Sequence, residues 1–343
     1  MKMPGRGLKA PPRIWALLGA RAGDNDQVMA LAEALDLPFE MKRLTFNRWR
    51  HLGPRLLGPS LLSLTRASRR NILSEPPPDL TISTGHRSVA VVRALRKRSR
   101  GRMQAIHVGF PRVSPGYFSL VITTEQFPIP DHPNLLRIPY ALTPAATNAA
   151  DHDDEGLRKL PGSMSLMIIG GPTLFWNLDQ PRLLERLDAM IGEARSNSGS
   201  VLVTTSRRTP VALRRQIAHT LDGSGVPSVL AEPGKTPTLG SLLAAADTIF
   251  VTAESVSMVS DAIWTGKPIA LISVKRSASG KVAFALNDVL RPGRRLYPQD
   301  LRYFWRALNE VGVSDQLSRP RTSTEAVITM ILNRVRPILK SIR

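Results

Sequence analysis

The chain contains no cysteine among its 343 residues. This absence excludes a disulfide framework, thiolate metal sites and a cysteine nucleophile, and it fits a reducing compartment. No apolar run approaches the ~20 residues that a membrane-spanning helix needs. The segment IWALLGA near the start lacks the length and the cleavage pattern of a secretory signal. We therefore expect a cytoplasmic protein.

Acidic residues are scarce relative to basic ones. The chain carries 47 Lys and Arg against 27 Asp and Glu, which gives a formal net charge of +20. Such an excess attracts polyanions in general. Aromatic residues make up only 5% of the chain, and no groove-reading motif is present, so we expect no specific nucleic-acid partner.

One stretch, from Met41 to Ser74, contains no acidic residue at all. Its basic residues are interleaved with a tryptophan and several leucines, a mixture typical of a surface that rests on anionic lipid headgroups or grips a polyanion. Contact with lipid would make the protein peripheral to the inner face of the cytoplasmic membrane. The predicted acceptor or membrane surface consists of Arg43, Arg48, Trp49, Arg50 and Arg55.

Apolar segments typical of strands and helices alternate along the chain and are separated by turns rich in Gly and Pro, as in an α/β protein. At 343 residues the chain is too long for one ordinary core and suits two domains. The order of the segments favours doubly wound sheets. We predict an N-terminal domain over residues 1–141, a linker over 142–163, a second domain over 164–285 and C-terminal helices over 286–343 that pack back on the N-terminal domain.

Three turns of the second domain follow predicted parallel strands and so should share one edge of the sheet. Glycines let backbone approach a phosphate, arginines supply charge, and a helix start supplies N–H groups. A carboxylate there can accept hydrogen bonds from ribose hydroxyls. The predicted donor-binding residues are Gly170, Gly171, Ser206, Arg207, Arg208, Thr209, Glu254, Ser255 and Ser257. In the structural alternative, Ser255 is an ordinary N-cap and Glu254 an acid favoured by the helix dipole.

The first domain offers candidate catalytic residues. Asp24 or Asp26, in a loop that opens a helix, can act as a general base towards an acceptor hydroxyl, and His86 follows another strand as an acid or base. The alternative for this loop is a capping-box-like pair, with Asp24 as N-cap and Gln27 at N3. No GxGxxG, HExxH, GxSxG or P-loop pattern surrounds these residues, so neither hydride transfer nor a hydrolase triad is supported.

Several strings together resemble the mitochondrial-fission elongated-mitochondria protein family. They are AGDNDQVMALAEAL near the start, LVTTSRRTP at 202–210 and VTAESVSMVSDAIWTGKPIAL at 251–271. The family's bacterial members are usually regarded as glycosyltransferases with a GT-B-like fold. The resemblance implies an α/β chain of two facing Rossmann-like domains, with parallel sheets and helices on both faces. This chain departs from the expected pattern at Glu254, Asp261 and Thr236-Pro237-Thr238.

The resemblance and the three turns lead to one expected activity and one alternative. We expect a metal-independent glycosyltransferase without a cofactor, which takes a nucleotide-sugar donor held mainly by the second domain. The first domain would approach the acceptor, a lipid-linked, membrane-associated or envelope glycan. The alternative is a non-enzymatic, membrane-associated adaptor that keeps the fold and uses the basic surface.

Overall fold

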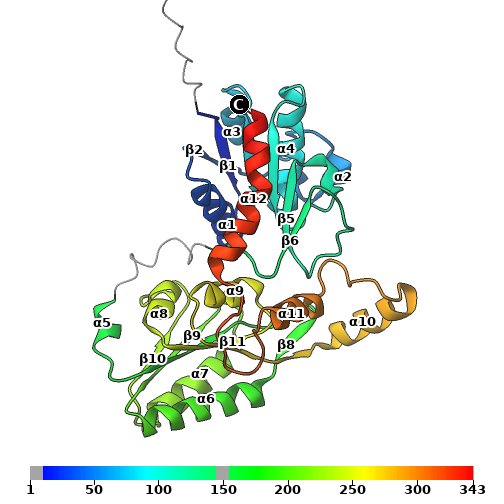
Figure 1. Ribbon diagram of the computed structural model, residues 1–343. Helices are drawn as coiled ribbons and strands as arrows, with labels where there is room; N and C mark the ends of the chain where they lie inside the picture. Colours follow the sequence, from blue (N-terminus) through cyan, green and yellow to red (C-terminus); the bar gives the residue numbers. More distant parts are fainter. Residues whose placement is uncertain (1–10, 144–153, 343) are drawn as a thin grey trace, which may run out of the picture. The chain divides into compact units, whose positions relative to one another are not determined.

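The computed structural model describes residues 11–143 and 154–342, so positions 144–153 of the predicted linker lie outside the described residues. The chain forms two compact α/β units (Figure 1). Among the described residues, the first unit comprises 11–123, 129–138 and 325–342, and the second comprises 124–128, 139–143 and 154–324. Neither unit is therefore one continuous stretch of sequence.

The first unit is built on a six-stranded sheet in the order β2-β1-β3-β4-β5-β6. In this sheet β2, β1, β3, β4 and β5 each run parallel to the neighbouring strand in that order. All of β1, IWALL, is buried, because a parallel strand covered on both faces needs an unbroken apolar run. The strands are β1 (Ile14–Leu18), β2 (Phe39–Arg43), β3 (Leu80–Thr84), β4 (Gln104–Val108), β5 (Leu120–Thr124) and β6 (Leu135–Ile138).

Helices pack on the sheet of the first unit through its apolar core. Trp15 and Leu17 of β1 join Val89 and Val92 of α4 in one buried cluster. α1 packs against β1 and β3. The helices of this unit are α1 (Ala22–Ala34), η1 (Arg48–His51), α2 (Pro54–Leu57), α3 (Arg66–Leu73), α4 (Gly85–Arg98), η2 (Pro115–Tyr117) and α12 (Thr324–Ile342).

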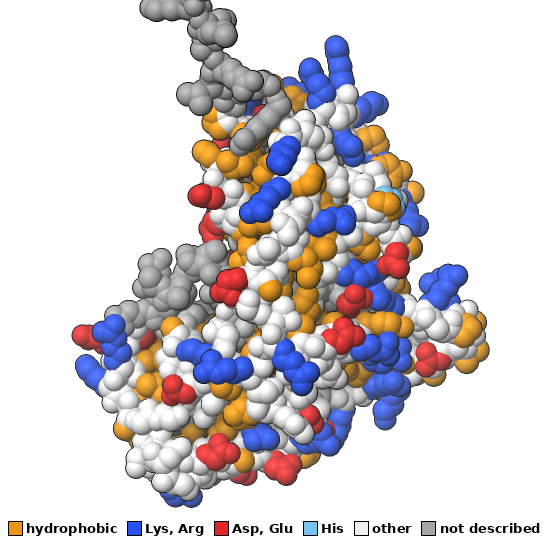
Figure 2. Space-filling view, viewed as in Figure 1, with side chains coloured by type: hydrophobic (Ala, Val, Ile, Leu, Met, Phe, Trp, Pro, Cys, Tyr) orange, Lys and Arg blue, Asp and Glu red, His pale blue; other side chains and the backbone are white. Residues whose placement is uncertain are grey.

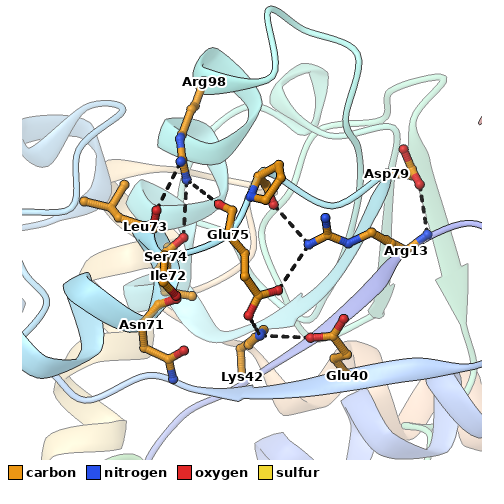
Figure 3. Close-up of polar contacts among 11 residues, drawn as sticks. Arg13, Glu40, Lys42, Asn71, Ile72, Leu73, Ser74, Glu75, Asp79 and Arg98 are labelled. Atoms are coloured by element: carbon orange, nitrogen blue, oxygen red, sulfur yellow. Dashed lines mark hydrogen bonds and ion pairs between the residues drawn. The ribbon is translucent and has the colours of Figure 1, made fainter.

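A polar network surrounds Glu75, in the loop before β3 (Figure 3). The Glu75 carboxylate accepts hydrogen bonds from Lys42 Nζ at 2.7 Å and from Arg13 Nη2 at 3.2 Å. Lys42 also pairs with Glu40 at 2.9 Å, and Arg98 Nη1 donates to the Glu75 carbonyl at 2.9 Å. The network connects the residue before β1 with β2 and with the loop after α3.

The second unit is built on a five-stranded parallel sheet in the order β10-β9-β7-β11-β12. A short antiparallel pair, β8 with β13, lies apart from it. The strands are β7 (Met164–Ile169), β8 (Trp176–Leu178), β9 (Ser200–Thr205), β10 (Ser228–Ala231), β11 (Thr248–Thr252), β12 (Ile269–Ile272) and β13 (Val274–Arg276).

Helices cover both faces of this second sheet (Figure 1). Leu183 and Leu187 of α6 and Ile217 of α7 pack with Met167 and Val203 on one face. α8 and α9 lie on the other face. The helices of the unit are α5 (Glu155–Arg158), α6 (Gln180–Ser196), α7 (Val211–Asp222), α8 (Leu239–Ala245), α9 (Val256–Trp264), α10 (Ala278–Leu290) and α11 (Leu301–Glu310).

The C-terminal helices divide between the two units. α12 belongs to the first unit, and Val327, Ile331 and Val335 are buried on one of its faces. α11 belongs to the second unit, where Trp305 Nε1 donates to the Ala253 carbonyl at 2.8 Å. For α11, the prediction that 286–343 pack back on residues 1–141 stays a prediction, although its N-cap residue Asp300 donates its amide to the Gln126 carbonyl at 2.7 Å.

Each sheet has a topological switch point, where successive strands are added on opposite sides of the starting strand. In the first unit it lies between β1 and β3, and in the second between β7 and β11. Ligands of open α/β sheets bind outside the carboxyl ends of the strands at such a point. The loops after these four strands are therefore the expected ligand-binding positions of the two sheets.

Candidate functional site

The three predicted donor-binding turns lie together in the second unit. They follow β7, β9 and β11, which are neighbours in the sheet. Since the strands are parallel, their carboxyl ends form one rim. Hydrogen bonds join the turn after β7 to each of the other two. The structure therefore brings together all nine residues of the predicted set.

Hydrogen bonds within the protein occupy the amides of both glycines on this rim. The Gly170 amide donates to Thr252 Oγ1 at 2.8 Å, and the Gly171 amide donates to Glu254 Oε1 at 2.8 Å. A Cβ on Gly170 would lie 1.7 Å from Glu254 Oε1, and one on Gly171 would lie 2.4 Å from the carbonyl carbon of Arg208. The glycines make room for protein atoms, rather than for the phosphate that the sequence analysis expected.

Glu254 lies beneath the rim, with only 4% of its surface exposed. Its Oε2 atom is buried and has no hydrogen-bond partner among the described residues. Burial raises the pKa of this carboxyl, although hydrogen bonds from its own amide, Thr252 and Gly171 act in the opposite direction. In this arrangement Glu254 braces the turns after β7 and β11 and does not offer an accessible oxygen to a ribose.

Hydrogen bonds of Ser206 and Thr209 hold the turn after β9 against Ile169 at the end of β7. Both are buried, and the Ser206 amide donates to Thr209 Oγ1 at 2.9 Å. The guanidinium of Arg208 donates to the Gly171 carbonyl at 3.2 Å. These contacts give the turn a fixed shape. Within the described part of the chain, the Arg207 side chain makes no hydrogen bond.

Arg207, Arg208 and Ser257 are the exposed members of the predicted set. Ser257 lies in the first turn of α9, where Ser255 is the N-cap by position but makes no capping hydrogen bond with its side chain. Arg208 lies close enough to Glu254, the residue before this N-cap, for its charge to lower the pKa of that carboxyl. A helix start without a side-chain cap presents N–H groups and the positive end of the helix dipole. Arg207, Ser257 and the first turn of α9 are therefore suited to an anion.

A hollow of about 390 Å³ opens beside the rim. Pro172 and Pro210, which follow the turns after β7 and β9, form part of its wall. Lys275 also lines it and pairs with Asp179 at 2.9 Å. A space of this size accommodates part of a small-molecule ligand. The remaining lining residues are Asn177, Leu178, Gln180 and Pro181.

The three predicted catalytic residues follow β1 and β3 in the first unit. Asp24 and Asp26 lie in the first turns of α1, and His86 is the second residue of α4. Burial raises the pKa of both aspartates. Burial lowers the pKa of His86 to about 4, and neighbouring arginines lower it as well. A Cβ on Gly85 would lie 3.6 Å from Asp24 Oδ2, so Asp24 lies beside the start of α4.

The capping-box alternative for this loop is wrong. α1 begins at Ala22, which places Asp24 inside the helix rather than at its N-cap. Asn25 fixes the preceding turn instead: its Oδ1 accepts from the Gly19 amide at 2.7 Å, and its Nδ2 donates to the Gly19 carbonyl at 3.1 Å. The carboxylate of Asp24 is thereby left for another role.

The predicted acceptor or membrane surface is exposed in the first unit. Trp49 is 48% exposed and Leu56 is 79% exposed, and the Arg48 guanidinium lies 5.3 Å from the centre of the Trp49 ring. This surface combines large apolar side chains with cations, as the sequence pattern indicates. Its five predicted residues, all exposed, are Arg43, Arg48, Trp49, Arg50 and Arg55.

A second apolar surface, on α10, was missed by the sequence analysis. Val282, Leu286, Val289 and Leu290 are between 55% and 77% exposed. Figure 2 shows hydrophobic side chains at the outer end of this helix with basic ones beside them. The signal in the sequence is a helix with two apolar faces, since Phe284 packs inward.

No three His, Cys, Asp or Glu side chains of residues 11–143 and 154–342 gather as metal ligands. In the same ranges, no helix combines the length and the apolar character of a membrane span.

Residues 22–300 match a family described as Mitochondrial fission ELM1. The chain belongs to this family. It is 22% identical over 298 residues to an uncharacterized protein of Rickettsia prowazekii, covering 75% of this chain and 82% of that protein. It is 25% identical over 234 residues to the mitochondrial fission protein ELM1 of Arabidopsis thaliana, covering 59% of this chain and 53% of that protein. The matched region thus spans about half of the Arabidopsis protein.

Solved structures share the fold of this ELM1-family chain. A protein of Listeria monocytogenes described as a UDP-N-acetylglucosamine 2-epimerase has a TM-score of 0.54 at 13% identity, covering 95% of this chain and 97% of its own. The UDP-GlcNAc 2-epimerase of Neisseria meningitidis, bound to UDP-GlcNAc, has a TM-score of 0.50 at 10% identity, covering 95% and 100%. The predicted family is confirmed, as is the α/β fold of GT-B type with parallel sheets and helices on both faces.

Proposed function

We propose that this chain is a metal-independent glycosyltransferase that takes a nucleotide-sugar donor. The observation that carries the proposal is the shared rim of β9, β7 and β11, which presents exposed Arg207 on the turn after β9 and exposed Ser257 in the first turn of α9, a helix without a side-chain cap. The leaving group of such a reaction is a nucleoside diphosphate. A guanidinium and the amides of a helix start stabilise the charge that develops on it.

The buried residues of the rim support this proposal indirectly. Glu254 and Thr209 fix the backbone of the turns, so the backbone groups of the rim do not have to be ordered when a ligand binds. Preorganised donors act more strongly on developing charge than mobile ones. The hollow beside Pro172 and Pro210 offers space for a further part of the donor.

The first unit would supply the proton acceptor. Asp24 is the favoured general base, with Asp26 as the second choice, because burial raises the pKa of each carboxyl towards neutral pH. His86, whose pKa is about 4, is neutral at pH 7, so it has no imidazolium proton to donate as a general acid, and it is a weaker base than an ordinary histidine. The proposed acceptor is a lipid-linked or envelope glycan, in keeping with the exposed basic surface around Trp49.

The fold-level likeness is compatible with a donor of this class. The Neisseria protein is bound to UDP-GlcNAc, and the likeness to it extends over the whole of that chain. At 10% identity this shows the fold alone. The argument for a nucleotide-sugar donor therefore depends on the residues of the rim. The nucleotide has to be identified by experiment.

Isothermal titration calorimetry with uridine and guanosine diphosphates, in the presence of EDTA, tests the proposal. We expect one of them to bind, and Arg207→Ala to weaken that binding on the order of tenfold or more, as expected for loss of a charge-assisted contact. Arg215→Ala, which removes an exposed arginine of α7, is the matched control. Absence of binding, or equal weakening in the two variants, would refute the donor site.

A non-enzymatic adaptor is the second candidate, and the exposed surface around Trp49 favours it. Such a surface binds anionic lipid through apolar contact and charge. Sedimentation with phosphatidylserine vesicles should then be lost in the Trp49→Ala, Leu56→Ala double variant. It should be kept in Leu174→Ala, which removes an exposed leucine of the second unit. Vesicle binding without sugar-nucleotide turnover would favour the adaptor, and indifference to vesicles would exclude it.

A further inference from the structure

The switch point of the first sheet carries three arginines that the proposed transfer reaction does not use. Arg21 follows β1, Arg87 follows β3 and Arg112 follows β4, and these strands are neighbours in the order β1-β3-β4. Because the strands are parallel, their carboxyl ends share one edge. Three guanidinium groups therefore gather at the position where open α/β sheets bind their ligands.

All three arginines lie close enough to His86 for their charges to act on its imidazole. Arg112, Arg87 and Arg21 each lower the pKa of its imidazole, after the larger effect of burial. Arg87 is half-buried, and its Nε atom is buried without a hydrogen-bond partner among the described residues. A buried guanidinium nitrogen without a partner is costly unless a ligand or water satisfies it.

The backbone at this edge adds further donors. α4 has 14 residues, and Thr84 at its N-cap makes no capping hydrogen bond with its side chain. The first turn of α4 thus offers N–H groups and the positive end of a helix dipole. Arg112 has a φ of 59°. Left-handed backbone at a non-glycine residue is strained and concentrates at functional sites.

Asp24 is an acidic group beside Arg21 and Arg87 of this cluster. Its Oδ2 lies beside Gly85, and the charges of Arg21 and Arg87 lower its pKa, although burial has the larger and opposite effect. The guanidinium groups of Arg21 and Arg87 outnumber this one carboxylate. They therefore leave a positive charge beside the start of α4 that an anionic ligand can neutralise.

We propose that the first unit binds a phosphate group at the carboxyl ends of β1, β3 and β4, held by Arg21, Arg87 and Arg112 together with the amides at the start of α4. Guanidinium groups bind phosphate oxygens in bidentate pairs, and a helix start binds them through N–H groups. The residues of this site belong to the first unit and differ from those of the donor rim, and the proposal does not depend on sugar transfer.

Binding of inorganic phosphate and of pyrophosphate to the full chain tests the site at constant ionic strength. The readouts are calorimetry and the NMR signal of the His86 ring, assigned with His86→Gln. We expect saturable binding and a His86 pKa that rises when the site is filled, because a nearby anion favours the charged imidazole. Arg87→Gln and Arg21→Gln should each weaken binding on the order of tenfold.

Control variants separate the site from general attraction to a basic protein. Lys97→Gln removes one positive charge from the exposed end of the same helix and should leave binding unchanged. Asp24→Asn removes a competing negative charge and should tighten it. No saturable binding at millimolar concentrations, or equal weakening in Lys97→Gln and Arg87→Gln, would overturn the proposal.

Two further arms identify the source of the phosphate and keep this proposal apart from the donor site. Dihexanoyl phosphatidic acid, a soluble lipid with a phosphomonoester headgroup, binds more tightly than inorganic phosphate when the site takes a lipid-borne group, and equally when it takes a free one. Arg207→Ala in the second unit should leave the phosphate response of His86 intact. A lost response in that variant would place the phosphate on the donor rim and refute the site in the first unit.

Discussion

Glu254 Oε1 accepts the hydrogen bond of the Gly171 amide at 2.8 Å, although 83 residues separate the two in the chain. The bond joins the carboxyl ends of β7 and β11 at the switch point of the second sheet. A protein carboxylate thus takes the amide that would otherwise face a ligand phosphate. The binding capacity of the rim shifts to its outer members, above all Arg207.

The two glycines of this rim should respond differently to the same substitution. Gly170→Ala places its Cβ against the flexible tip of Glu254, whereas Gly171→Ala places it against the backbone of Arg208. Each should reduce the free energy of unfolding by roughly 1–3 kcal/mol, as overpacking does. In a Glu254→Ala background the effect of Gly170→Ala should largely disappear, and that of Gly171→Ala should persist.

Urea unfolding of the single and double variants measures these glycine effects. Gly192→Ala in α6, where an added Cβ meets nothing within 4 Å, is the control and should not destabilise the protein. Equal rescue of both glycine variants by Glu254→Ala would show that the contacts described for Gly171 are wrong.

The raised pKa of Glu254 makes the second unit less stable as pH rises. Between the ordinary glutamate pKa of about 4.3 and the higher pKa of the folded state, the folded chain holds a proton that the unfolded chain has released. Stability therefore falls with rising pH across this window and is constant above it. Glu254→Gln should abolish this loss of stability with rising pH, measured by hydrogen exchange of the β7 and β11 amides. Glu185→Gln, which changes an exposed residue of α6, should leave the loss unchanged.

The histidines of the first unit should destabilise it in acid. The pKa of His86 is lowered to about 4 and that of buried His107 to about 3, in both cases chiefly by burial. Below the ordinary histidine pKa of about 6.5, the unfolded chain binds protons that the folded chain does not. Stability should therefore fall as the pH drops from about 6.5 towards 3.

Hydrogen exchange of the β3 and β4 amides at several pH values measures this loss in the first unit. His86→Gln should reduce the slope between pH 4 and 6.5 by about one proton. His219→Gln, which removes an exposed histidine of the second unit, should leave it unchanged. An unaltered slope in His86→Gln would contradict the burial described for that ring.

Glu75 should contribute to stability at neutral pH and lose that contribution in acid. The hydrogen bond from Lys42 lowers the pKa of the carboxyl below its usual range. Its contribution is complete above the ordinary pKa and is lost as the pH falls through the lowered one. Glu75→Gln should lower the urea midpoint at pH 7 but not at pH 2, and Asp36→Asn serves as a control. A midpoint unaffected at pH 7 would show that solvent screens the pair completely.

The positions of the donor turns could be predicted from local pattern, but their internal contacts could not. Strand Thr248–Thr252 and the helix face with Val259 and Ile263 follow from periodicity, and parallel strands place their carboxyl ends together. Nothing near Glu254 indicates that its partner is Gly171. That bond depends on the register of two strands far apart in sequence.

The sequence analysis missed or misplaced three features, because each depends on something that no local sequence pattern shows. The start of α1 at Ala22 is set by the side chain of Asn25 and its two bonds to Gly19, which no capping pattern contains. β8 and β13 have three residues each, too few for an alternation to be seen. The arginines at the switch point of the first sheet lie on three separate loops, so only the strand order brings them together.

The discontinuity of the two units has a consequence for biosynthesis. Helix α12 is translated after the entire second unit, yet Val327, Ile331 and Val335 complete the core of the first. At about 5–20 residues per second, the nascent first unit exposes the apolar patch that this helix covers for many seconds. A ribosome-associated chaperone would meet that bare patch before the native fold closes over it.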